Sequence, residues 1–187
     1  MPITFKKGDS SAILEKSKEI FDKLEKNNIS TILDDRKEYT PGWKFHEWEL
    51  KGIPIRIEIG PRDLKQNQIT LARRDTYQKI NAKIEDTIQA TKSLLVEIQK
   101  NLYTKAKERL IGKITTVNNY EDFKETLKIK GGFLKAAWCG KSECEEKIKA
   151  ETGATIRLKP LTKESSTDNC ILCNEKSEET VYFARSY

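Results

Sequence analysis

The clearest hydrophobic pattern in the chain is a strict alternation between residues 53 and 59. Isoleucine occupies every odd position, and Pro54, Arg56 and Glu58 occupy the even ones. Because successive side chains of a strand point to opposite faces, we expect the four isoleucines on a buried face and the two charged residues on the other. Residues 68–73 repeat this alternation, and shorter strands are expected at residues 31–33 and 77–80.

Helical spacing dominates the rest of the first hundred residues. Apolar residues recur at three- and four-residue intervals, which predicts helices over residues 11–26 and 83–110. A shorter helix is expected over residues 43–51, where Gly52 ends it. Strands that lie between helices predict an α/β layered domain.

Gly112 is the predicted boundary between two domains, one of residues 1–111 and one of residues 112–187. The second domain is expected to be a small α+β unit. Its predicted helices cover residues 119–129 and 142–151, and its predicted strands cover residues 132–138, 155–158 and 180–185.

The composition is that of a globular protein with a charged surface: 36% of residues are hydrophobic, 34% are charged, and the formal net charge is +6. No apolar run approaches the ~18 residues of a membrane span, and no leader pattern opens the chain, so we expect a cytoplasmic protein with no membrane partner. The positive charge favours polyanionic partners, because each neutralised phosphate releases counterions, but the 29 acidic residues weaken this signal.

The four cysteines are the most specific chemical signal. Four residues separate Cys139 from Cys144, and two residues separate Cys170 from Cys173. Two such pairs can supply the four thiolates of a tetrahedral zinc site, in which no position is left for an activated water, so the metal would be structural. Four free thiols or two disulfides are the alternatives, and zinc is favoured over both.

Polar residues in and beside the isoleucine strand suggest a nucleic-acid interface. Arg56 and Glu58 project from the strand, Glu49 precedes it and Arg62 follows it. Guanidinium groups donate to guanine, carboxylates accept from base amino groups, and single-stranded RNA exposes those edges. A solvated sheet face with ion pairs is the alternative, and spacing alone favours it.

Aromatic residues in the helix of residues 43–51 could stack on bases. The helical spacing nevertheless favours core positions for Phe45 and Trp48, and leaves Trp43 open. His46, the only histidine, is expected to have a surface or hydrogen-bonded structural role rather than a catalytic or metal-binding one. We find no Gly-rich phosphate loop, no Ser-His-Asp set and none of the ATP-binding signatures of class II synthetases.

Residues 39–56 read Tyr-Thr-Pro-Gly-Trp-Lys-Phe-His-Glu-Trp-Glu-Leu-Lys-Gly-Ile-Pro-Ile-Arg. Together with residues 60–64 and 73–76, they closely resemble the anticodon-binding domain of archaeal- and eukaryotic-type prolyl-tRNA synthetases. The cysteine pairs and residues 183–187 resemble the additional C-terminal domain of that family, which bacterial-type enzymes lack. The resemblance covers nearly the whole chain.

The resemblance implies a fold and a set of site residues. The fold is α/β, a mixed five-stranded sheet flanked by helices of the class II anticodon-binding type, followed by a small α+β zinc domain. Residues at the positions of Glu49, Arg56, Arg62 and Lys79 would read the guanines of the proline anticodon, and the four cysteines would hold structural zinc. The carboxylate of Tyr187 would approach the catalytic centre of the full enzyme. We assign contacts with the tRNA backbone to Lys44 and Arg74.

The chain departs from the family in that the catalytic domain, which would use ATP and Mg²⁺, is not part of it. The first strand of the anticodon domain is also shortened, to residues 3–5. We therefore expect an inactive C-terminal fragment of a proline–tRNA ligase, with tRNA(Pro) and its own catalytic domain as partners in a homodimeric enzyme. A free-standing RNA-binding or regulatory module that reuses this fold is the main alternative, and a protein-interaction appendage with no RNA role is another.

Overall fold

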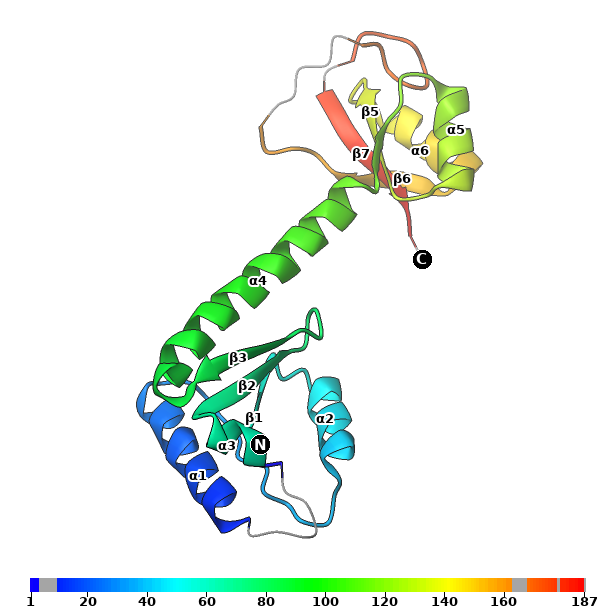
Figure 1. Cartoon of the computed structure of the whole chain (residues 1–187). Helices are drawn as coiled ribbons and strands as arrows, with labels where there is room; N and C mark the ends of the chain where they lie inside the picture. The colour runs from blue at the N-terminus through cyan, green and yellow to red at the C-terminus, as the bar shows by residue number, and fades with distance from the viewer. Residues whose placement is uncertain (4–9, 163–167, 178, 187) are drawn as a thin grey trace. The chain divides into compact units, whose positions relative to one another are not determined.

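The computed structural model describes residues 1–3, 10–162, 168–177 and 179–186 (Figure 1). The chain divides into two compact units, Met1–Thr104 and Lys105–Tyr187, and the long helix α4 (Thr87–Ile111) contributes residues to both. The domain boundary expected at Gly112 remains a prediction. Among the described helices, none is both long and apolar enough to cross a membrane.

An antiparallel three-stranded sheet forms the centre of the first unit. Its strands are β1 (Ile55–Glu58), β2 (Gln68–Arg73) and β3 (Lys79–Lys83), in the order β1-β2-β3. Helix α1 (Ser11–Lys26), the 3-10 turn η1 (Ile84–Asp86) and α4 cover one face (Figure 1). The apolar core lies between these layers and includes Ile20 and Leu24 of α1, Ile69 and Leu71 of β2, and Leu94 and Ile98 of α4. The predicted helices and the two longer strands of this unit are therefore present.

Helix α2 (Pro41–Leu50) lies on the opposite side of the sheet from α1 and α4 (Figure 1). Thr40 caps its first turn by accepting a hydrogen bond from the backbone N–H of Trp43, and Pro41 occupies the first helical position. Gly52 follows the helix with φ +85°, a left-handed conformation that glycine adopts at little cost. The short helix α3 (Pro61–Lys65) follows β1 directly.

The first unit differs from the five-stranded sheet that the resemblance implies. Residues 31–33 form no strand: the backbone N–H of Thr31 donates to the Glu25 carboxylate, and the Thr31 hydroxyl donates to the carbonyl of Ile29. Near the start of the chain only an isolated parallel bridge forms, between Pro2 and Ile59. Residues 4 and 5 of the expected first strand lie outside the described residues.

An open edge of β1 explains why the buried isoleucine face is incomplete. Ile59 is fully buried, but Ile53, Ile55 and Ile57 are only half-buried. They line an apolar groove of about 190 Å³ between residues 29–34 and β1, with residues of α1 and α4 as its floor. The prediction that all four isoleucines would be buried is therefore wrong for three of them.

The second unit contains a four-stranded mixed sheet in the order β4-β5-β7-β6. Its elements are β4 (Ile114–Thr116), α5 (Tyr120–Ile129), β5 (Phe133–Trp138), α6 (Ser142–Thr152), β6 (Ala154–Leu158) and β7 (Glu179–Arg185). Phe123 of α5, Ile148 of α6, and Leu134 and Phe183 of the sheet are fully buried together. These elements confirm the predicted α+β character of this part of the chain.

Strand β4 is the element that the sequence pattern did not predict. It has three residues and pairs in parallel with β5. Gly132, at φ +82°, permits this pairing, because a Cβ atom there would lie 2.4 Å from the carbonyl oxygen of Lys113. A strand this short carries too little alternation to be recognised.

Candidate nucleic-acid interface and cysteine cluster

Arg56 is the centre of a polar cluster between α2 and the sheet. Its Nη1 donates to Glu49 Oε1 at 2.8 Å, and its Nε donates to Glu58 Oε1 at 3.0 Å. The guanidinium carbon also lies 3.8 Å from the centre of the Phe45 ring, a cation–π contact. Lys79 joins the cluster from β3, with its Nζ 2.8 Å from Glu58 Oε2. The structure thus brings together Glu49, Arg56 and Lys79, three of the four predicted base-reading residues.

The strand register explains how these side chains meet. Arg56 pairs with Ala72 and Ala72 pairs with Lys79, so the three residues form one row across the sheet. Directly paired residues of an antiparallel sheet point to the same face, and the short side chain of Ala72 leaves room between the two cations. Glu58, two residues after Arg56, lies on the same face.

This face is not the solvated sheet surface that the strand pattern alone favours. Helix α2 covers it, so that Glu58 is only 7% exposed and the Arg56 side chain only 13%. Ion pairs are present, as the alternative of a solvated sheet face also predicted, but their side chains are largely shielded from water. Pairs of this kind hold side chains in defined positions more firmly than exposed pairs do.

The remaining predicted contact residues lie in different surroundings. Arg62 is exposed on α3, and in the described parts of the chain no hydrogen bond or ion pair links it to the cluster. Arg74 is exposed after β2, and its Nε donates to the backbone carbonyl of Glu49 at 2.7 Å. Lys44, expected at a tRNA phosphate, is 5% exposed and its ammonium lies 3.4 Å from Asp34 Oδ1.

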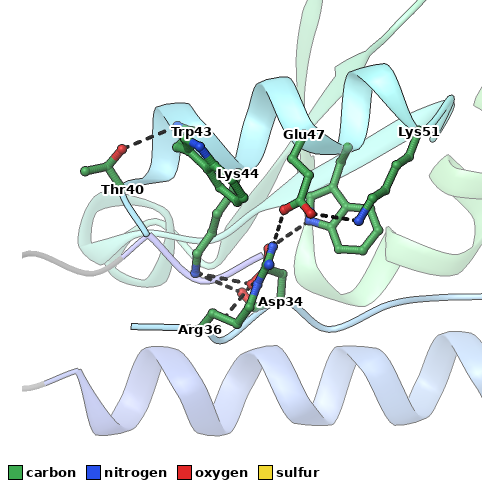
Figure 2. A network of polar contacts seen from close by, with 8 residues as sticks. Asp34, Arg36, Thr40, Trp43, Lys44, Glu47 and Lys51 are labelled. Carbon is green, nitrogen blue, oxygen red and sulfur yellow. Dashed lines mark hydrogen bonds and ion pairs between the residues drawn. The ribbon is translucent and has the colours of Figure 1, made fainter. Parts of the chain in front are cut away.

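Asp34 anchors the other side of α2 through a network that the sequence pattern does not predict (Figure 2). Its carboxylate accepts hydrogen bonds from Arg36 Nε at 3.0 Å and Nη2 at 2.8 Å, and from Trp48 Nε1 at 2.8 Å. Arg36 also pairs with Glu47, which in turn pairs with Lys51 at 2.7 Å. The bonds from Arg36 hold the pKa of the Asp34 carboxyl well below its usual range, although burial acts in the opposite direction.

The aromatic residues of α2 contact cations rather than the apolar core. Trp48 is half-buried, with the Lys51 ammonium 4.5 Å from its ring centre, and Phe45 contacts Arg56 as described above. The prediction of core positions for Phe45 and Trp48 is therefore wrong. Trp43 is 45% exposed and stacks on Tyr39, with the ring centres 3.9 Å apart.

His46 is on the exposed side of α2, where its side chain is 83% exposed and Nδ1 lies 3.7 Å from Glu49 Oε2. The described residues provide no metal-ligand partners around it, since the one group suited to a metal consists of the four cysteines. This position agrees with the expected surface role.

The four cysteines converge in the second unit. Cys139 follows β5, Cys144 lies in α6, and Cys170 and Cys173 lie in the turn before β7. Their sulfur atoms all lie within 4.8 Å of one another, and those of Cys139 and Cys144 are 3.5 Å apart. A tetrahedral zinc–thiolate site with bonds of ~2.3 Å has sulfur–sulfur distances of about 3.8 Å, so the arrangement fits such a metal.

The environment of the sulfur atoms divides the cysteines into two kinds. Burial raises the pKa of the Cys139 and Cys144 thiols. Burial also acts to raise the pKa of Cys170, but backbone hydrogen bonds from Cys173, Leu172 and Cys139 outweigh it and lower that pKa to about 7. Backbone N–H groups directed at a sulfur stabilise a thiolate, the form that binds metal.

Comparisons with known proteins cover both parts of the chain. Residues 1–94 match the family described as anticodon binding domain, and residues 120–187 match the family described as prolyl-tRNA synthetase, C-terminal. A protein named proline–tRNA ligase from Alkaliphilus oremlandii (strain OhILAs) is 46% identical over 175 residues, which cover 94% of this chain and 36% of the relative. Proline–tRNA ligase 2 from Clostridioides difficile (strain 630) is 39% identical over 187 residues, which cover 100% of this chain and 38% of the relative.

The chain thus spans only 36% to 38% of the length of these two relatives. Both relatives come from bacteria, so the comparisons do not support the archaeal and eukaryotic type that the sequence resemblance suggested. The comparisons do assign a family to the N-terminal part and to the C-terminal part of the chain. The chain belongs to the anticodon-binding domain family, and with its C-terminal match it corresponds to the C-terminal region of a prolyl-tRNA synthetase.

Proposed function

We propose that this chain binds the anticodon of proline tRNA, as the C-terminal region of a proline–tRNA ligase. The observation that carries the proposal is the cluster of Glu49, Arg56 and Lys79 between α2 and the sheet. Three residues that the resemblance assigns to base reading have side chains linked through Arg56 and Glu58.

The chemistry of the cluster suits guanine. Arg56 can donate two parallel hydrogen bonds to O6 and N7, and Glu49 can accept from the amino group of the same or a neighbouring base. Anticodon bases are unpaired, so these edges are accessible. Lys79, 52% exposed at its side chain, extends the donor surface towards β3.

We assign contacts with the tRNA backbone to exposed cationic side chains. Arg74 is exposed beside the cluster, and Arg62 is exposed at the end of β1, so both can reach phosphates or an anticodon base. We assign Lys44 a role in fixing α2 and no longer a contact with phosphate, because its ammonium is buried against Asp34.

The four cysteines hold one structural zinc ion in this proposal. The fit of the sulfur positions to a tetrahedron and the stabilised Cys170 thiolate support it. The metal would stabilise the turn that carries Cys170 and Cys173, which has few core residues of its own.

In the longer protein we propose that the residues before Met1 complete the sheet. The carbonyl of Ile57 accepts from Met1 N, and Ile59 exchanges backbone hydrogen bonds with Met1 and Ile3, so the odd-numbered residues of this segment face the open edge. A strand continuing backwards from Met1 would run parallel to β1 and fill the apolar groove. With residues 31–33 on its other side, it would give the five-stranded sheet that the resemblance implies.

The whole enzyme would activate proline with ATP and Mg²⁺ in its catalytic domain, act as a homodimer in the cytoplasm, and charge tRNA(Pro). Its assignment to the archaeal and eukaryotic type rests on the resemblance of residues 39–56 and of the cysteine pairs. Tyr187 lies outside the described residues, and the approach of its carboxylate to the catalytic centre rests on the resemblance.

Titration of the 187-residue chain with proline tRNA tests the proposal. We expect binding that weakens with salt, and weaker binding to the same tRNA with an anticodon guanine replaced by adenine. Equal affinity for the two tRNAs would contradict anticodon reading. No salt-dependent binding to either would favour the protein-interaction alternative.

A further inference from the structure

Glu58 is an almost buried carboxylate that the resemblance does not place among the base-reading residues. It is 7% exposed, and both of its oxygens are occupied: Oε1 accepts from Arg56 Nε at 3.0 Å, and Oε2 pairs with Lys79 Nζ at 2.8 Å. One carboxylate thus holds the two cations that the proposed function assigns to the anticodon. Glu58 lies on strand β1, and helix α2 covers its side chain.

The contacts of Glu58 leave a defined part of Arg56 available. A guanidinium has five N–H donors in a rigid fork. Glu58 takes the Nε donor, Glu49 takes one donor of Nη1, and the Phe45 ring lies 3.8 Å from the guanidinium carbon. Among the described residues no acceptor binds the Nη2 donors or the second Nη1 donor, and adjacent Nη1 and Nη2 groups can form an edge that matches O6 and N7 of guanine.

Glu49 and Glu58 differ in a way that separates their roles. Glu49 bonds Arg56 through Oε1, whereas in the described parts of the chain its Oε2 has only the long 3.7 Å contact with His46, and its side chain is 25% exposed. Glu49 therefore keeps an acceptor for a base amino group. Both Glu58 oxygens already accept from a cation, and the residue is only 7% exposed, so its remaining lone pairs are poorly accessible to a base.

We propose that Glu58 is a positioning residue for anticodon recognition: it fixes the guanidinium of Arg56 and the ammonium of Lys79 in the orientation that reads the bases, and does not contact RNA itself. Residues held before binding lose less conformational freedom when the ligand binds, so a fixed fork discriminates better than a mobile one. The two carboxylates also balance the two cations, so this cluster adds little to the salt dependence of binding.

The test compares Glu58→Ala and Glu58→Gln with the matched control Glu47→Gln in the 187-residue chain. Glu47 is also a carboxylate with two cationic partners, Arg36 and Lys51, but it faces the Asp34 side of α2. The first measurement, which needs no RNA, is the hydrogen-exchange rate of the Arg56 Nε–H group by NMR. We expect faster exchange in Glu58→Ala and no change in Glu47→Gln.

The second measurement is the ratio of affinities for an anticodon stem-loop RNA with the proline anticodon and for one with a guanine replaced by adenine. We expect Glu58→Ala to reduce this ratio roughly tenfold, within the range for losing one bidentate base contact. Glu58→Gln should lie between Glu58→Ala and the wild type, because an amide keeps one acceptor.

The outcomes separate this inference from the proposed function on which it rests. If Arg56→Ala reduces discrimination but Glu58→Ala changes neither discrimination nor exchange of the Arg56 Nε–H group, the positioning role is wrong while anticodon reading stands. If wild-type chain binds both RNAs equally, anticodon reading fails, and the role of Glu58 in it fails as well. An equal loss of discrimination in Glu47→Gln would show a general effect of loosening α2 and would also overturn the proposal.

Discussion

The guanidinium carbon of Arg56 lies 3.8 Å from the centre of the Phe45 ring, so a strand residue and a helix residue form a single surface. Glu49 and Phe45 reach this surface from one side of α2, and the Asp34 network holds the other side of the same helix (Figure 2). The position of α2 over the sheet therefore determines the geometry of the proposed reading site.

Replacing Asp34 by Asn should destabilise the first unit. The carboxylate is 2% exposed and accepts from Arg36 and Trp48, and its loss leaves Lys44 as a buried cation without a charged partner. Breaking a buried pair from one side costs about 3–5 kcal/mol. Hydrogen exchange of the β1 and β2 amides measures this unit specifically. Glu19→Gln, which removes an exposed carboxylate with two lysine partners, should cost far less.

Acid should weaken the same network. The folded-state pKa of Asp34 is depressed, chiefly by the hydrogen bonds from Arg36, so its stabilisation is fully present above the unfolded-state pKa of about 3.9 and is lost as the pH falls through the folded-state value. Below about pH 4 the free energy of unfolding should therefore decline more steeply in the wild type than in Asp34→Asn. Parallel pH profiles for the two proteins would contradict this role.

The helices and the longer strands could be predicted because each carries its period over many residues. The alternation of residues 53–59 and 68–73 places β1 and β2 almost at their observed bounds. The burial of Glu58 could not be predicted, since it depends on α2 packing across the sheet. The role of Asp34 was hidden in the same way, because Asp34-Asp35-Arg36-Lys37-Glu38 reads as a solvated run of charges. The convergence of the cysteines, in contrast, followed from their spacing alone.

The cysteine cluster predicts a stoichiometry and a local effect. Metal analysis of the purified chain should give about one zinc ion, and Cys173→Ser should lower this content and loosen the turn before β7. Amide exchange should increase in the second unit and remain unchanged in β1–β3. A chain that carries no metal and keeps its second unit folded in the presence of a chelator would contradict the site.

Extending the chain at its N-terminus by about ten residues of the longer protein should stabilise the first unit. These residues would pair with the open edge of β1 and bury Ile53, Ile55 and Ile57 more completely. Amide exchange of Ile55 and Ile57 should slow in the extended chain. An extension of equal length made of Gly and Ser is the matched control, and equal exchange rates in the two proteins would argue against strand addition.

The most direct test of anticodon reading is the charging specificity of the full-length enzyme carrying Arg56→Ala. The measurement is kcat/KM for proline tRNA and for the same tRNA with one anticodon guanine replaced, with Arg74→Ala as the matched arginine control. We expect Arg56→Ala to reduce discrimination between the two tRNAs by about 1–3 kcal/mol, and Arg74→Ala to weaken both alike and flatten the salt dependence. If Arg56→Ala lowers kcat/KM for both tRNAs by the same factor, Arg56 does not read a base, and the cluster between α2 and the sheet is only structural.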